Sequence, residues 1–157
     1  MLSICAATGH RPGKLGGYSP AAADRLDRLA VEYLSITRPD GTISGMALGW
    51  DQAWARASVR LGIPFVAAVP FEGQEKTWPA ESQVAYQTLL GAADAIFTVC
   101  EGGYAAWKLQ KRNQWMVDRC TRLVSLWDGT AGGTKNCIDY AAGRVEIVNL
   151  YERFNHV

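Results

Sequence analysis

Short apolar runs alternate along the chain with segments whose apolar residues recur every three or four positions. The runs predict buried strands, and the spacing of three or four predicts amphipathic helices. The predicted strands cover residues 2–7, 42–46, 63–69, 94–100, 122–127 and 145–150. Five helices are predicted. The first begins at Ser19-Pro20, the next three cover residues 50–61, 79–92 and 104–120, and the fifth ends near residue 142.

This alternation of strands and helices indicates an α/β fold with a mainly parallel sheet and helices on both of its faces. We expect a Rossmann-like three-layer sandwich of about six strands. Residues 1–150 are predicted to form a single domain, and residues 151–157 a polar C-terminal tail that is frayed.

Composition and charge narrow the choice of partners. The chain has 157 residues, of which 48% are hydrophobic and 20% are charged, and its net charge is +1. These values are typical of a soluble globular protein and give no global field for nucleic acid or an anionic membrane. We therefore expect neither nucleic acid nor a membrane as a partner, and a homodimer stays open.

The N-terminus and the cysteines carry no targeting or metal motif. Residues 1–8 are apolar but lack the basic start of a signal peptide, so we expect a cytoplasmic protein. No pair of the four cysteines has C-x-x-C spacing, and buried free thiols are the simplest interpretation. We expect no metal centre and no cofactor.

Three loops that follow predicted strands contain candidate ligand-binding residues, because ligands of open α/β sheets bind beyond the carboxyl ends of the strands. The first is Thr8-Gly9-His10-Arg11, where Gly9 permits close approach and His10 and Arg11 offer donors to an anion. Lys14 and the glycines after it suit a mobile, basic flap. A solvated loop with a turn glycine is the alternative interpretation.

The second loop contains Ser44, Gly45 and Gly49 and leads into a helix that begins near Trp50. Free amides at a helix N-terminus favour a phosphate group. Asp51, in the first turn of that helix, either pairs with the helix dipole or accepts a hydrogen bond from a ribose hydroxyl. The glycine spacing matches neither G-x-G-x-x-G nor a Walker A loop.

The third loop runs from Asp128 to Thr134, between the fifth strand and the fifth helix. Gly132 and Gly133 leave space at the start of a helix and Thr134 supplies a hydroxyl, so this segment is another candidate anion site. A flexible loop before a helix is the alternative.

The helix at residues 104–120 carries a polar residue on its inner face. Asn113 falls among the apolar positions Leu109, Met116 and Cys120, with Arg112 beside it. A buried polar side chain needs a partner, because an unsatisfied one costs about 1–3 kcal/mol. We therefore expect Asn113 to be buried and hydrogen-bonded. Arg112 and Asn113 either reach the ligand edge of the sheet or stabilise loop backbone.

Together these segments resemble the YpsA/YoqJ-like branch of the SLOG superfamily, whose members occur in bacteria and phages. The resemblance extends over nearly the whole chain. It rests on residues 8–12 with 15–18, residues 44–51, residues 112–118 and residues 127–134. It implies a Rossmann-like fold that binds a nucleotide or a nucleotide-derived ligand.

The wider superfamily includes the LOG phosphoribohydrolases and the DNA-processing protein DprA. The LOG enzymes carry a G-G-x-G-T-x-x-E motif with a catalytic glutamate, and Cys137 stands at that position here. The resemblance therefore implies ligand binding, as a sensor or sequestering module, more strongly than hydrolysis. The alternative is an N-glycosidase acting on a nucleoside phosphate or an ADP-ribose-like compound, with Asp51 or Asp128 as the catalytic carboxylate.

Overall fold

A single sheet of six parallel strands spans the computed structural model, which describes residues 1–157. The strands are β1 (Ile4–Gly9), β2 (Gly41–Ser44), β3 (Phe65–Val69), β4 (Ala95–Thr98), β5 (Arg122–Leu126) and β6 (Glu146–Asn149). Their order is β4-β3-β2-β1-β5-β6, and every neighbouring pair is parallel. The chain builds outward from β1 to β4 and then returns to β5 on the other side of β1. The carboxyl ends of β1 and β5 therefore form the switch point where such sheets bind ligands.

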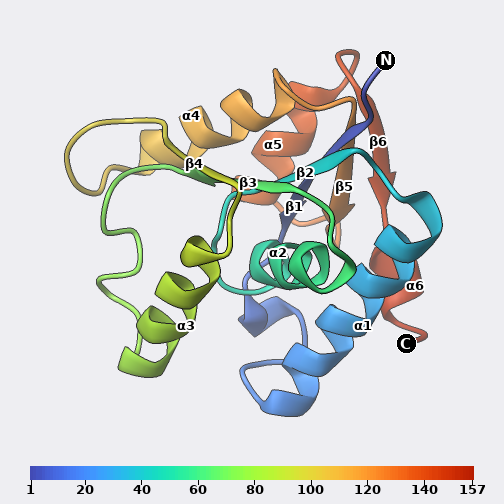
Figure 1. The fold of residues 1–157 in the computed structure, drawn as a ribbon, viewed down its shortest axis with the longest axis horizontal. Helices are drawn as coiled ribbons and strands as arrows, with labels where there is room; N and C mark the ends of the chain where they lie inside the picture. Colours follow the sequence, from blue (N-terminus) through green and yellow to red (C-terminus); the bar gives the residue numbers. More distant parts are fainter.

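Helices cover both faces of the sheet, which completes the three-layer Rossmann-like fold expected from the sequence (Figure 1). One face carries α1 (Pro20–Thr37), α2 (Trp50–Leu61), α3 (Ala80–Gly91) and the short α6 (Tyr151–Phe154). The other face carries α4 (Ala106–Val117) and α5 (Gly133–Ala141). A 3-10 turn, η1 (Pro12–Lys14), follows β1.

Large side chains on the helices fill the core against small residues on the central strand. Trp50 and Trp54 of α2 are fully buried, and they pack beside Cys5 and Ala7 of β1. The indole of Trp50 donates to the carbonyl of Val124, and that of Trp54 to the carbonyl of Cys5. These bonds fix the start of α2 against β1 and β5, directly beneath the switch point.

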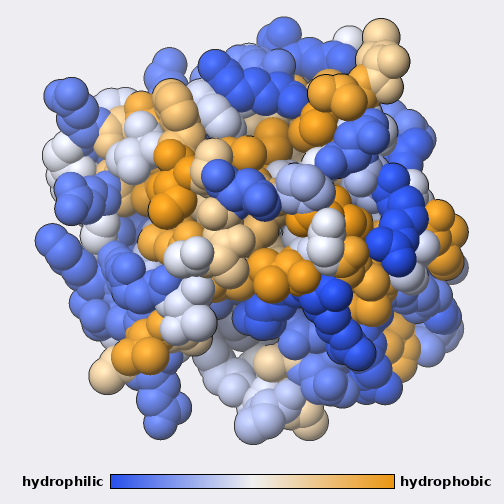
Figure 2. All heavy atoms as spheres, viewed as in Figure 1, coloured by the Kyte–Doolittle hydropathy of each residue, from blue (hydrophilic) through white to orange (hydrophobic).

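The edge strand β4 is exposed along its whole length. Ile96 and Phe97 are about half exposed, and Phe97 stacks on Trp115 of α4 with ring centroids 4.7 Å apart. Apolar side chains gather near β3 and β4 on the face shown in Figure 2, which is the view of Figure 1. None of the helices combines the length and the apolar character needed to cross a membrane.

The C-terminal tail differs from the prediction. Residues 151–154 form α6 instead of fraying, and Phe154 is only 4% exposed within the main core. The guanidinium of Arg25 lies 4.4 Å from the Phe154 ring centroid, and Arg153 pairs with Glu32 at 2.8 Å. The prediction of a frayed tail is wrong because seven residues are too few to show a helical period.

Candidate functional site

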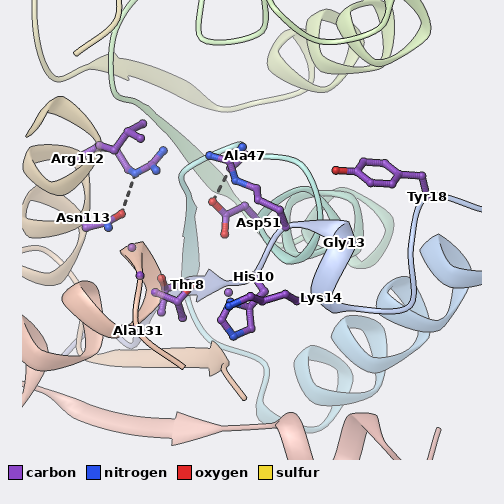
Figure 3. A pocket seen from close by; sticks show the side chains of 16 residues that line it. Thr8, His10, Gly13, Lys14, Tyr18, Ala47, Asp51, Arg112, Asn113 and Ala131 are labelled. Atoms are coloured by element: carbon purple, nitrogen blue, oxygen red, sulfur yellow. Dashed lines mark hydrogen bonds between the residues drawn. The ribbon is translucent and has the colours of Figure 1, made fainter. Parts of the chain in front are cut away.

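The three candidate loops converge, as expected, on one pocket of about 410 Å³ at the carboxyl ends of β1 and β5 (Figure 3). Residues from α4 close its remaining side. The predicted site residues that line it are Thr8, Gly9, His10, Arg11, Asp51, Arg112, Asn113, Gly132, Gly133 and Thr134. Four other predicted residues, Ser44, Gly45, Gly49 and Asp128, do not line the pocket.

Three side-chain contacts join the loop after β1 to the loop after β5, and one of them is a hydrogen bond from the amide of Asp128 to His10 Nε2 at 3.1 Å. The Nε2 atom of His10 lies 2.7 Å from Oδ1 of Asp128, and Lys14 Nζ donates to Thr130 Oγ1 at 2.6 Å. Thr130 also donates to Asp128 through its amide and hydroxyl. Chiefly because of these bonds from Thr130, and also because of His10, the pKa of Asp128 lies well below its usual range. Asp128 therefore holds His10 in place from behind the pocket wall.

The N-terminus of α5 opens onto the pocket without a cap. Gly132 precedes the helix with a φ of 144°, and no side chain bonds to the amides of the first turn. A Cβ atom added to Gly133 would meet nothing within 4 Å, so open space lies beside these amides. Free amides and the positive end of the helix dipole favour an anionic group here.

A buried arginine forms the wall contributed by α4. Arg112 is 5% exposed; its Nε donates to Asn113 Oδ1 at 2.9 Å and its Nη1 to the carbonyl of Gly45 at 2.7 Å. A Cβ on Gly45 would lie 2.7 Å from Nη1, so this glycine makes room for the guanidinium. Asn113 is 7% exposed and also donates to Gln110, which confirms that it is buried and hydrogen-bonded.

Asp51 is the one carboxylate that lines the pocket, and it is 6% exposed. Its Oδ2 accepts a long bond of 3.4 Å from the amide of Ala47, whereas its Oδ1 has no partner. Ser44 Oγ donates to the Asp51 carbonyl and accepts from the amide of Met46. Ser44 thus shapes the turn that places Asp51 instead of contacting a ligand.

Burial disfavours the charged forms of both Asp51 and Arg112. Burial raises the pKa of Asp51, and the nearby positive charges of Arg112 and Arg11 oppose that rise. Burial lowers the pKa of Arg112, and the charge of Asp51 opposes the decrease. The carboxylate and the guanidinium make no direct ion pair, so each can still interact with a ligand group.

Cys137, at the position of the LOG glutamate, is fully buried on α5 within the core cluster that also contains Met116 and Leu123. Burial raises the pKa of its thiol to about 12, although a hydrogen bond with Thr8 acts to lower this pKa. This position supplies no carboxylate and no thiolate. No group of three or more His, Cys, Asp or Glu side chains is arranged to hold a metal ion.

Several lining residues were missing from the predicted site set: Gly13, Lys14, Tyr18, Ala47, Leu109 and Ala131. Tyr18 is 73% exposed and reaches the pocket from the flap, as Figure 3 shows. Tyr18 directly follows Gly16-Gly17 of the predicted basic flap, and this position could have indicated that it contacts a ligand. Leu109 and Ala47 carry no chemical signal, because their role is to shape the wall.

The fold and the pocket define a Rossmann-like α/β protein with an anion-favouring helix N-terminus at its switch point. A family model described as the YspA SLOG family (YpsA) matches residues 42–152. The chain belongs to this YpsA family of SLOG proteins.

Two curated relatives illustrate the range of similarity. The SPbeta prophage-derived protein YoqJ of Bacillus subtilis (strain 168) is 36% identical over 134 residues, which cover 75% of this chain and 78% of YoqJ. A UPF0398 protein of Lysinibacillus sphaericus (strain C3-41) is 23% identical over 145 residues, covering 83% of this chain and 79% of that protein.

Two solved structures share the fold. The DNA processing protein A (DprA) of Streptococcus pneumoniae matches with a TM-score of 0.69 and 15% identity, over 94% of this chain and 50% of that chain. This chain thus spans half the length of that protein. DprA of Helicobacter pylori matches with a TM-score of 0.63 and 14% identity, over 98% of this chain and 79% of that chain.

The H. pylori structure is described as showing a single-stranded DNA binding mode of DprA. This finding contradicts our expectation, drawn from the net charge, that nucleic acid is not a partner. Net charge is a poor guide to such a partner because it averages over the whole surface and does not show the charge at one site. The pocket itself is lined by Arg11, Lys14 and Arg112 but by only one carboxylate, Asp51.

Proposed function

We propose that the protein binds a nucleotide or a nucleotide-derived small molecule in the pocket at the switch point, as a sensor or sequestering module. One observation carries the proposal: an uncapped helix N-terminus and a buried aspartate with an unpartnered carboxylate oxygen line the same pocket. The helix N-terminus favours an anion and the carboxylate favours a hydrogen-bond donor, and a nucleotide contains both.

The other lining residues are consistent with such a ligand. Arg11 and Lys14, in the loop after β1, carry positive charge for phosphate groups, and Tyr18 offers a ring face to a base. Membership of the SLOG family supports a nucleotide-related role. Binding is favoured over hydrolysis because Cys137 replaces the glutamate that the LOG motif supplies.

The similarity to DprA favours a second candidate, which is binding of single-stranded DNA. Phosphate groups of a strand would then lie at the α5 N-terminus, and Arg11 and Lys14, in the loop after β1, would contact neighbouring phosphates. Such binding weakens steeply with salt, whereas binding of a single nucleotide does so less because fewer phosphates are neutralised.

The test begins with native mass spectrometry of freshly purified protein, followed by thermal-shift measurements with nucleotides and a fluorescent oligonucleotide. Gly133→Val fills the open space beside the α5 amides, so it should abolish nucleotide binding while the fold persists. Gly103→Val is the matched control, because a Cβ there also meets nothing within 4 Å and Gly103 lies outside the pocket. Equal nucleotide affinity of Gly133→Val and the unmodified protein would reject the pocket assignment.

Base release separates binding from the N-glycosidase alternative. Chromatography of nucleoside monophosphates and ADP-ribose incubated with the protein should show no free base. Steady release that disappears in Asp51→Asn, a variant that keeps the side-chain shape, would replace the binding proposal with the enzyme.

A further inference from the structure

Asp51, a residue that lines the pocket, has a buried carboxylate oxygen that the protein leaves without a partner. Asp51 is 6% exposed, its Oδ2 has only the long bond from Ala47, and its Oδ1 accepts no hydrogen bond. Asp51 also lines the pocket, where Figure 3 shows its carboxylate below Ala47. A buried acceptor of this kind favours a ligand that brings a donor to it.

The charges around Asp51 restrict the kind of donor. A phosphate at this end would be repelled by the carboxylate, and an ammonium group would be repelled by Arg112 and Arg11, whose charges both act on Asp51. A neutral donor avoids both penalties.

Arg112 adds a second requirement at the same place. Its Nε and Nη1 are already bonded to Asn113 and Gly45, whereas its Nη2 donates to no protein acceptor. A ligand group beside both side chains would meet a donor on Arg112 as well as the free acceptor on Asp51. A hydroxyl group can accept from the one and donate to the other, and two adjacent hydroxyls can serve both residues at once.

We propose that the pocket selects nucleotides whose ribose carries free 2′ and 3′ hydroxyls, and that Asp51 is the residue that discriminates against deoxyribose. The inference rests on the proposed function, because the phosphate at the α5 N-terminus presents the sugar to Asp51 and Arg112. A deoxyribose leaves Asp51 Oδ1 buried beneath the ligand without a donor.

Paired probes test the selection without knowledge of the base. The four ribonucleoside 5′-monophosphates are compared by calorimetry with their 2′-deoxy counterparts, and ribose 5-phosphate is compared with 2-deoxyribose 5-phosphate. Each deoxy compound should bind about 10- to 100-fold more weakly, the ratio expected for a lost hydrogen bond to a charged group. A 3′-deoxy nucleotide should show a penalty of similar size.

Substitution at Asp51 identifies the residue responsible. Asp51→Asn should reduce the ribose-to-deoxyribose ratio severalfold, because its amide oxygen is retained by Ala47 and its NH₂ group then competes with Arg112 for the hydroxyls. Asp24→Asn, at an exposed position on α1, should leave the ratio unchanged.

The outcomes separate the two proposals. Equal affinity for ribose and deoxyribose ligands, with binding still lost in Gly133→Val, overturns the sugar selection and leaves nucleotide binding in place. If Asp51→Asn keeps the ribose-to-deoxyribose affinity ratio of the unmodified protein, Asp51 is not the residue that discriminates. Absence of binding by every probe rejects the proposed function and this inference together.

Discussion

The contact between Gly45 and Arg112 predicts an unusually large effect of adding one methyl group. In Gly45→Ala the new Cβ would lie 2.7 Å from Nη1 and 2.8 Å from Cζ of Arg112, closer than such atoms pack. The guanidinium is buried and held on both sides, so it cannot move away freely.

The magnitude follows from two contributions. Forcing an extra group into a filled site costs about 1–3 kcal/mol, and loss of the charged hydrogen bond to the Gly45 carbonyl costs about 1.5–3 kcal/mol. Since displacement of Arg112 relieves part of the overlap, we expect a loss in unfolding free energy of about 3 kcal/mol. For a chain of this size that is a decrease in Tm of roughly 6–12 °C.

Urea unfolding measured in a double-mutant cycle is the assay. Gly45→Ala is made in the unmodified protein and in the Arg112→Ala and Arg112→Lys backgrounds. The cost should fall to less than about 1 kcal/mol once Arg112 is removed, because the overlapping atoms are gone. Gly133→Ala, with open space around its Cβ, should change stability by no more than about 0.5 kcal/mol. An equal cost of Gly45→Ala with and without Arg112 would refute the reasoning.

Two further predictions concern stability. Phe154→Ala should lower the unfolding free energy by about 3 kcal/mol, since the ring is buried, whereas Tyr104→Ala at a 73% exposed position should have little effect in the same urea titration. The lowered pKa of Asp128 contributes stability that is present above its unfolded pKa of about 3.9 and is lost as the pH falls toward the lower folded value. Asp128→Asn should therefore destabilise the protein more at pH 7 than at pH 2; equal destabilisation at both would contradict the assigned hydrogen bonds.

The order of the elements was predictable because each strand and helix has its own local period. The helix at Trp50–Leu61 matches its predicted bounds, since Gly49 and Gly62 mark its ends. The first strand instead extends through Thr8 and Gly9, because these residues continue the pairing with Ser125 and Leu126. That pairing is tertiary and leaves no mark on the local sequence.

The pocket was predictable as a set of loops but not as a set of roles. Parallel strands place the loops after β1 and β5 at one edge, so their convergence follows from topology. The role of Gly45 depends on an arginine 67 residues away, and Asp128 turned out to support His10 from outside the pocket. Such roles arise from contacts between distant segments, which periodicity cannot show.

The central position of β1 has a consequence for the growing chain. Every residue that lines the pocket belongs either to residues 8–51 or to residues 109–134, and none comes from the segment between them. Until β5 has been synthesised, β1 is an edge strand whose outer side is unpaired, and the α5 N-terminus does not yet exist. A ligand of this pocket therefore cannot assist early folding. It can stabilise the protein only after the last third of the chain has docked.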